Sequence, residues 1–289
     1  MTTSCCPGWV RFAEMEYPEN LSHLSSCKSP HQMFGAIIKS YYAEKNKIDP
    51  KNIYVVSVMP CIAKKFERQR EEMKVNGLWD VDSVITTREL ARMIKQANIE
   101  FDKLEDETFD SPMGEATGAA AIFGVTGGVM EAALRTAYEL ITGKELKKLE
   151  FEEIRGAKGI KKATVQIGDK EVKVAVAHGL SNARKIMEEI KNGTSDYQFV
   201  EVMACPGGCI MGGGQPIKSS KVRMTVDVAA KRAEAMYSID ERSVIRKSHE
   251  NPILKQIYKE YIGKPGEHKA HELLHTHYMK REMNFEDIS

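Results

Sequence analysis

Two cysteines four residues apart in a glycine-rich stretch give the strongest chemical signal in the sequence. Cys205 and Cys209 lie in EVMACPGGCIMGGGQP, residues 201–216, with one proline and two glycines between them. Two thiolates at this spacing can bind one soft metal centre. Glycines let the backbone approach a bulky object, because no Cβ intervenes. A structural zinc ion needs only a short turn, so this many glycines and prolines favour a larger object, an iron–sulfur cluster.

The other cysteines are consistent with reduced thiols that are available as ligands. Four more occur in the 289-residue chain, which is long enough to bury its own core: Cys5, Cys6, Cys27 and Cys61. Disulfide frameworks are typical of small secreted chains, and the sequence shows neither a signal peptide nor an apolar run of about 20 residues. A formal net charge of +1 gives no general attraction to nucleic acid or to anionic membranes. We therefore expect a cytoplasmic protein with no membrane span and no nucleic-acid partner.

The first half of the chain predicts a strand–helix–strand unit that positions Cys61. Residues 52–58 form a short apolar run typical of a buried parallel strand, and a charged helix is predicted over 62–74. Cys61 thus lies where a strand ends and a helix begins, a place that favours a negative thiolate. A second strand is predicted at 83–87, followed by a helix that begins with a Thr86–Glu89 capping box.

The second half predicts a similar arrangement that leads into Cys205. Strands at 163–167 and 171–177 are joined by a Gly-Asp hairpin signal, and a helix follows over 181–193. The strand 198–204 then runs directly into the cysteine. Before this unit, a small-residue helix over 119–143 is expected to break near 124–128, because several glycines occur there. Residues 221–289 are charged and predicted to be helical.

Three features have alternative readings. Cys5 and Cys6 are adjacent, so their side chains point in different directions, and an ordinary loop position remains open for both. Cys27 has no second cysteine nearby and is more typical of a buried small residue than of a ligand. His271 and His275 match the two-histidine helix of zinc proteases, but no third ligand is placed for such a site, so amphipathic packing is favoured.

Three segments together resemble the signature motifs of iron-only (FeFe) hydrogenases. They occur in the order of that family: TSCCPGW at 3–9, MPCIAKKFE at 59–67 and EVMACPGGCIMGGGQP at 201–216. FGVTGGVMEAALR at 123–135 and HELLHTHY at 271–278 are also similar to the family, which gives the histidine pair an explanation without zinc. The resemblance covers essentially the whole chain.

The resemblance implies an α/β fold in a single catalytic domain, residues 1–289. Two lobes of twisted mixed sheet flanked by helices, at about 28–110 and 115–220, would hold the metal cluster in the cleft between them. A helical C-terminal region would wrap around them over 221–289.

The resemblance also implies a cofactor and a role for each motif residue. A 4Fe-4S cubane would be held by Cys6, Cys61, Cys205 and Cys209. Cys209 would also bridge to a two-iron subcluster carrying carbon monoxide, cyanide and an azadithiolate, and the whole is called the H-cluster. Cys5 would pass protons, Lys64 would face a cyanide ligand, and Ser25 would belong to the proton path. The cofactor pocket would include Ser29, Met59, Pro60, Glu67, Phe123 and Met203.

The chemistry of these residue types agrees with the implied roles. An anionic cluster needs a cation, and a buried lysine is a compact charged donor. A thiol, with an unperturbed pKa of about 8.5, is a plausible proton relay near neutral pH.

The chain departs from the family pattern in two ways. Position 31 is histidine where the family leads us to expect glutamine. Family domains also carry roughly ninety more residues upstream, a segment that supplies two glutamates of the proton path on either side of Ser25. The cysteine sets of accessory ferredoxin-like domains are absent from the sequence as well. We therefore expect an external ferredoxin-like electron donor, dedicated maturation proteins, and a second copy or another subunit in place of the upstream segment.

The leading functional hypothesis is reversible reduction of protons to hydrogen. A non-catalytic relative that keeps the cubane for iron–sulfur cluster assembly is the first alternative, and a hydrogen-sensing relative is the second. Cys5, Lys64 and the GGGQP stretch argue against the assembly reading, and sensory relatives typically replace the relay cysteine. The sequence leaves open the physiological direction, the electron donor and the oligomeric state.

Overall fold

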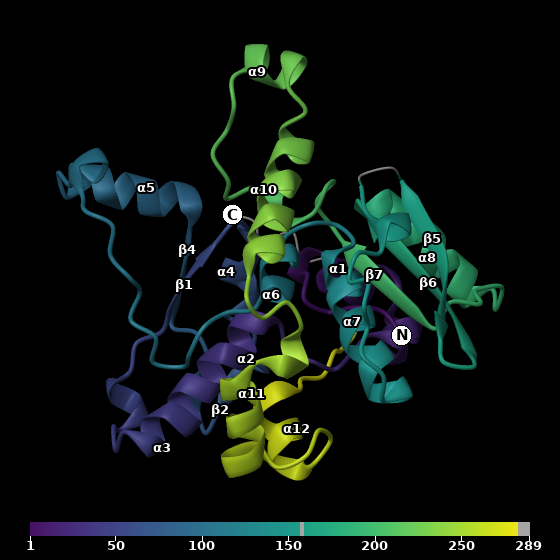
Figure 1. The fold of residues 1–289 in the computed structure, drawn as a ribbon, viewed down its shortest axis with the longest axis horizontal. Helices are drawn as coiled ribbons and strands as arrows, with labels where there is room; N and C mark the ends of the chain where they lie inside the picture. The colour runs from purple at the N-terminus through teal and green to yellow at the C-terminus, as the bar shows by residue number, and fades with distance from the viewer. Residues whose placement is uncertain (157–158, 283–289) are drawn as a thin grey trace.

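Two groups of strands lie on opposite sides of the molecule, with helices between them. The computed structural model describes residues 1–156 and 159–282. In Figure 1 the strands β1 and β4 lie to the left and β5, β6 and β7 to the right, with α1, α4, α6 and α7 between them. None of the helices in the described part is long and apolar enough to cross a membrane.

The first group contains a parallel pair of strands crossed by a short helix. β1 pairs with β4 so that Ser57 lies opposite Val84, and β2 with β3 forms a small, separate antiparallel hairpin. The predicted Thr86–Glu89 capping box is present at the start of α5. The elements are α2 (Pro30–Ile37), α3 (Ala43–Lys45), β1 (Val56–Met59), α4 (Ala63–Glu67), β2 (Lys74–Val75), β3 (Leu78–Trp79), β4 (Ser83–Thr86) and α5 (Thr87–Gln96).

Two elements predicted for this part are shorter in the structure than the sequence indicated. The strand predicted at 52–58 begins only at Val56, after a 3-10 turn over Pro50–Asn52, and Val56 and Val58 are 49% and 44% exposed. The strand is not fully buried, because β4 is the strand that pairs with it and nothing among the described residues covers its outer face.

The helix predicted over 62–74 ends at Glu67. Beyond it the chain turns so that the Arg70 guanidinium reaches inward and donates hydrogen bonds of 2.6 and 2.9 Å to the Glu14 carboxylate. A buried charged pair of this kind outweighs helix propensity, because an unpaired buried charge is costly.

The second group is a three-stranded mixed sheet in which β7 and the second half of β6 are buried on both faces, while the edge strand β5 leaves one face exposed. β5 (Ile160–Ile167) and β6 (Lys170–His178) form the predicted hairpin, and β7 (Phe199–Met203) pairs with β6 in parallel. Successive β6 residues face opposite sides. Ala175 and Ala177 pack in a core with α8 (Leu180–Lys191), while Val174 and Val176 pack with residues of α7 (Gly128–Thr142).

The predicted break in the small-residue helix is present. α6 (Gly118–Ile122) and α7 are separated by residues 123–127, and α7 ends before Gly143, which is left-handed at φ 65°. Gly127 has φ 92°, and a Cβ there would meet the Ile154 carbonyl oxygen at 2.4 Å. Glycine is therefore required at this turn.

The C-terminal region is helical as far as Leu274. Its helices are α9 (Ser220–Thr225), α10 (Val228–Arg242), α11 (Pro252–Ile257) and α12 (His268–Leu274). Residues 275–282 are extended instead, because Thr276 donates its backbone N–H to Ser26 and Arg281 pairs with Glu14 and Glu72. The last part of the predicted helical region, 283–289, lies outside the described residues.

Candidate metal centre

The N-terminal residues place Cys5 and Cys6 at the end of the three-stranded sheet. The Thr3 backbone N–H donates a hydrogen bond of 2.9 Å to the Val200 carbonyl oxygen. The Thr3 hydroxyl oxygen accepts one of 3.0 Å from the Val202 backbone N–H, so the N-terminal segment follows the edge of β7. β7 ends at Met203, so the chain leaves the sheet at the same end and leads into Cys205. The helix α1 (Pro7–Glu16) begins directly after Cys6, which is its N-cap residue.

The glycine-rich loop after Cys205 packs against two other segments that resemble the family, 59–67 and 123–135. A Cβ on Gly212 would meet the Pro60 carbonyl oxygen at 2.3 Å, and one on Gly214 would meet the Cys61 nitrogen at 3.0 Å. A Cβ on Gly208 would meet the Thr126 nitrogen at 2.6 Å. We interpreted these glycines from sequence as room for a bulky object. The structure shows that these three make room for neighbouring backbone and so hold the cysteines near one another.

The four predicted cluster ligands lie close enough to one another to interact electrostatically. The Ala204 backbone N–H lies 3.3 Å from the Cys6 sulfur, and Cys6 lies in electrostatic range of the three other thiols. Burial raises the pKa of Cys61, Cys209 and Cys205, the last to about 11.

The spacing of the thiols fits a cluster better than a single ion. Thiolates around one tetrahedral zinc ion lie roughly 3.8 Å apart, from a Zn–S bond of about 2.3 Å. In the described part of the chain, no three cysteine sulfurs lie within 4.8 Å of one another. Four thiols that are not gathered around a single ion are compatible with a larger iron–sulfur object.

A buried lysine lies beside Cys5. The Lys64 ammonium donates to the Cys5 main-chain oxygen at 2.8 Å and to both Glu67 oxygens at 2.9 and 3.1 Å. Burial raises the pKa of Cys5 to about 12, and the nearby Lys64 charge opposes this rise. Burial by itself would raise the pKa of Glu67, but the Lys64 charge and the His31 hydrogen bond outweigh burial and lower this pKa to about 2. The result is a buried ion pair next to the proposed relay cysteine.

The remaining predicted residues lie on the segments that carry the cysteines or in contact with them, and Ser25 is the exception. Ser29 is buried and donates its hydroxyl to Glu67 at 2.7 Å, and Met203 is buried at the end of β7. Met59 and Pro60, which directly precede Cys61, are half-buried. Phe123 is also half-buried and lies in the turn that Gly208 contacts. Ser25 accepts the Cys27 backbone N–H at 3.3 Å, and no described hydrogen bond joins it to Cys5.

Sequence reasoning missed two buried carboxylate contacts. Glu201 on β7 accepts backbone N–H groups of Gly127 and Met130 at 2.6 and 2.7 Å, which fixes the turn before α7, and burial raises the pKa of Glu201 to about 7. An acidic residue in the middle of an apolar strand was the available signal. The second contact joins Glu67 to His31, which the sequence marked only as a departure from the family.

The histidine pair near the C-terminus does not form a zinc site in the described structure. The rings of His271 and His275 stack with centroids 4.3 Å apart, but α12 ends before His275, whose Nδ1 lies 2.8 Å from the Ser26 hydroxyl. No third donor joins them among the residues described.

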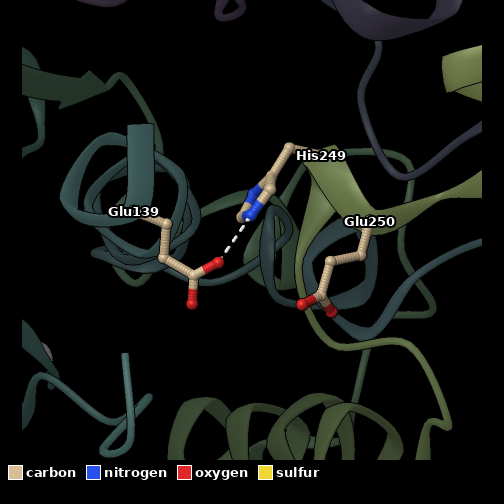
Figure 2. Close-up of side chains that lie close together, drawn as sticks. All are labelled: Glu139, His249 and Glu250. Atoms are coloured by element: carbon tan, nitrogen blue, oxygen red, sulfur yellow. Dashed lines mark hydrogen bonds and ion pairs between the residues drawn. The ribbon is translucent and has the colours of Figure 1, made fainter. Parts of the chain in front are cut away.

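A second cluster of possible metal ligands lies between α7 and the segment before α11. Figure 2 shows Glu139, His249 and Glu250 close together, with the His249 Nε2 atom 2.8 Å from Glu139. The Lys247 ammonium already lies 2.6 Å from Glu139 and 3.1 Å from Glu250. A protein cation thus compensates both carboxylates, so we assign this cluster a structural role.

Comparison with known proteins decides the family. Residues 1–213 match the family described as iron only hydrogenase large subunit, C-terminal domain, and residues 226–281 match the iron hydrogenase small subunit. The chain belongs to the iron-only hydrogenase family. The resemblance seen in the three cysteine motifs is therefore confirmed.

Individual relatives support this assignment. NADP-reducing hydrogenase subunit HndD from Solidesulfovibrio fructosivorans is 55% identical over 97% of this chain and 47% of the relative. Iron hydrogenase 1 from Clostridium pasteurianum is 53% identical over 97% of this chain and 49% of the relative. Protein NAR1 from Arabidopsis thaliana is 34% identical over 96% of this chain and 60% of the relative. The chain spans about half the length of the two hydrogenase relatives.

Solved structures confirm the α/β fold class. One described as showing stepwise [FeFe]-hydrogenase H-cluster assembly in HydA(deltaEFG) has a TM-score of 0.82 and 43% identity, and covers 97% of this chain and 76% of that one. A variant of apo [FeFe]-hydrogenase HydA1 from Chlamydomonas reinhardtii has a TM-score of 0.83 and 42% identity, with 98% and 76% covered.

Proposed function

We propose that the chain is the catalytic domain of an iron-only hydrogenase, which interconverts two protons and two electrons with one molecule of hydrogen. The observation that carries this proposal is the buried Lys64, whose ammonium lies between Glu67 and the Cys5 main chain next to the cysteine ligands. Holding a cubane alone requires four thiolates and no buried cation beside a fifth thiol.

The cofactor we propose is the H-cluster implied by the motifs. Cys6, Cys61, Cys205 and Cys209 would hold the cubane, and Cys209 would also bind the two-iron subcluster with its carbonyl, cyanide and azadithiolate ligands. When bound, this group supplies one-electron redox chemistry and the site where protons and electrons combine.

The chain's own residues would supply charge, a dry surface and protons. Lys64 would hold negative charge on the cofactor, and Glu67 keeps the lysine oriented through two hydrogen bonds. Met203, Phe123, Met59 and Pro60 would exclude water from the cofactor. The Cys5 thiol would pass protons to and from it, and Ser25 would act further out on the proton path.

We further propose that electrons come from an external ferredoxin-like donor and that dedicated maturation proteins build the two-iron unit. A partner polypeptide, either a second copy or another subunit, would cover the outer face of β1. Support for a partner comes from the exposed apolar side chains on that strand. The cytoplasmic location expected from the reduced thiols stays a prediction.

One alternative has its own support. The NAR1 relative and proteins named as cytosolic iron–sulfur cluster assembly factors match over 96% of the chain, at 29–34% identity. An assembly role would require the cubane without the two-iron unit. The identities of 53–58% to named hydrogenases favour catalysis.

An infrared spectrum of the protein produced together with maturation proteins separates these readings. Metal-bound carbonyl and cyanide absorb where protein groups do not. We expect such bands together with hydrogen evolution from reduced methyl viologen. A protein that contains a cubane but shows neither the bands nor hydrogen evolution would support the assembly role instead.

A further inference from the structure

A histidine lies between an open groove and the wall of the proposed site. The His31 ring on α2 makes two hydrogen bonds in opposite directions. Its Nδ1 atom is 3.0 Å from the Ser57 hydroxyl on β1, and its Nε2 atom is 2.5 Å from the Glu67 carboxylate on α4. The side chain is only 6% exposed. His31 on α2 therefore bridges β1 and α4.

The outer end of this bridge opens to solvent. His31 and Ser57 line a groove of about 350 Å³, together with the mainly apolar side chains of Phe34, Tyr54 and Val56. The groove is large enough for many water molecules, since one water occupies about 30 Å³ of liquid. Water can therefore reach the Ser57 hydroxyl and the outer side of the ring.

The inner end of the bridge reaches the site. The Glu67 carboxylate is buried and accepts hydrogen bonds from Ser29 and from Lys64, and Lys64 also donates to the Cys5 main-chain oxygen. A proton that arrives at Glu67 is therefore one side chain away from the residue proposed to exchange protons with the cofactor.

The resting protonation state follows from the contacts. Burial lowers the pKa of His31 and the Lys64 charge adds to this, while the hydrogen bond to Glu67 opposes it. The ring is then neutral, donates Nε2–H to the Glu67 carboxylate and accepts the Ser57 hydroxyl on Nδ1. The charged groups facing the ring are Glu67 and Lys64 on α4, and Tyr54 and Tyr42 are the titratable side chains of the groove wall.

We propose that His31 carries protons between this groove and Glu67. In the direction of hydrogen evolution, Nδ1 takes a proton from the Ser57 hydroxyl, which regains one from groove water. The ring then releases its Nε2 proton to the carboxylate. Reorientation of the ring then turns the protonated Nδ1 towards Glu67 and the bare Nε2 towards Ser57, so that the transfer can repeat with the two nitrogens exchanged, and for hydrogen oxidation the steps reverse. No electron moves through the histidine. This inference rests on the proposed hydrogenase function and adds the route by which protons enter.

The test compares His31→Gln with the unchanged chain, both produced with maturation proteins. Glutamine keeps an N–H donor for Glu67 but cannot carry a proton, so it separates transfer from positioning. We expect the same infrared bands in both proteins and an unchanged KM for reduced methyl viologen. The kcat should fall by roughly 10- to 100-fold, the lower part of the range for positioned proton transfer.

A second variant tests chemical rescue. His31→Ala removes the ring beside an open groove, so added 4-methylimidazole should restore turnover in a saturable manner. His249→Gln is the matched control, because His249 also bonds through both ring nitrogens, to Thr136 and Glu139, in the separate cluster of Figure 2. That control should leave kcat unchanged.

A pH-jump experiment without turnover gives a readout other than activity. Under inert gas, the infrared bands of the unchanged chain should reach their new positions faster than those of His31→Gln, and both proteins should reach the same final spectrum. Equal rates, or a different final spectrum in His31→Gln, would overturn the relay and leave the proposed function standing. A matured protein without carbonyl and cyanide bands would overturn the proposed function, and the relay with it.

Discussion

At the scale of single residues, the six cysteines divide by what surrounds them. Cys6, Cys61, Cys205 and Cys209 lie close to one another, and Cys5 adjoins Lys64. Cys27 lies apart, where its backbone pairs with that of His275. The motifs could indicate the first group, because each of the four cysteines is next to a proline or a glycine in the sequence. No pattern in the sequence could show that Gly208, Gly212 and Gly214 make room for neighbouring backbone segments.

The first prediction concerns iron. We expect about four irons per chain without dedicated maturation proteins and about six with them, as holding a cubane and a two-iron unit requires. Replacing Cys6, Cys61 or Cys205 with alanine should abolish cubane binding, while the control Cys27→Ala should retain it. Iron and labile-sulfide analysis measures both. One zinc per chain and no sulfide would contradict the cluster assignment.

The second prediction concerns Cys5. Cys5→Ser keeps the size of the side chain but replaces the thiol with a much weaker acid. We expect normal cluster content and a loss of turnover on the order of 10²-fold or more, the scale of positioned proton transfer. Cys5→Asp should recover part of the rate. Hydrogen evolution from reduced methyl viologen measures the effect, and near-normal turnover in Cys5→Ser would remove the thiol from the mechanism.

At the scale of elements, a buried ion-pair network joins the two segments that match different family models. Arg135 on α7 donates to Asp240 on α10 with two bonds of 2.8 Å, and to Glu131 at 2.6 Å. Arg135 lies in the large-subunit match and Asp240 in the small-subunit match. A Cβ on Gly118 would meet an Asp240 side-chain oxygen at 2.3 Å, so α6 and α10 are in close contact.

The third prediction follows from this network. Arg135→Ala leaves two buried carboxylates with less compensation, although Arg155 and Arg246 still reach them. We expect a loss of about 3 kcal/mol in the free energy of unfolding, the low end for a broken buried pair. Lys231→Ala on α10 is the control, because its pair with Glu234 is exposed to solvent and its removal should leave the unfolding midpoint nearly unchanged. Urea denaturation measures both, and equal midpoints would contradict the role of the network.

The elements show where sequence reasoning reaches its limit. The capping box at Thr86, the hairpin at 168–169 and the glycine break before α7 depend on local chemistry, and all three were predicted correctly. The early end of α4 depends on Arg70 reaching Glu14, and the extended segment after Leu274 depends on pairing with residues near 26. Both are contacts between residues distant in sequence, which periodicity and capping signals do not encode.

At the scale of the whole molecule, one apolar face remains uncovered. Val56 and Val58 on β1 are 49% and 44% exposed and Tyr54 just before the strand is 71% exposed, whereas Ser57 is buried. The solved relatives are longer than the region this chain matches, since 76% of each is covered. An exposed apolar strand edge is a site for pairing with another polypeptide. We therefore expect a partner surface here, from a second copy or from another subunit.

The last prediction is that this face controls both assembly and activity. A partner that pairs with β1 at Val58 would complete the sheet beside the proposed site and leave the groove at His31 and Ser57 open, so dissociation should abolish hydrogen turnover and leave the isolated chain prone to aggregation. Val58→Lys places a charge on the exposed face of β1, and its stability cost should be small because the side chain is already exposed. We expect a smaller particle by light scattering and a parallel loss of turnover.

The matched control for this prediction is Val244→Lys. Val244 is fully exposed and lies away from β1 in sequence, in the segment after α10, so the substitution should change neither particle size nor turnover. Light scattering coupled to activity decides the question, because a strict monomer with full activity at working concentration eliminates the partner. In that case water reaches the relay cysteine directly, and Ser25→Ala should cost little turnover, in agreement with the absence of a hydrogen bond from Ser25 to Cys5 among the residues described.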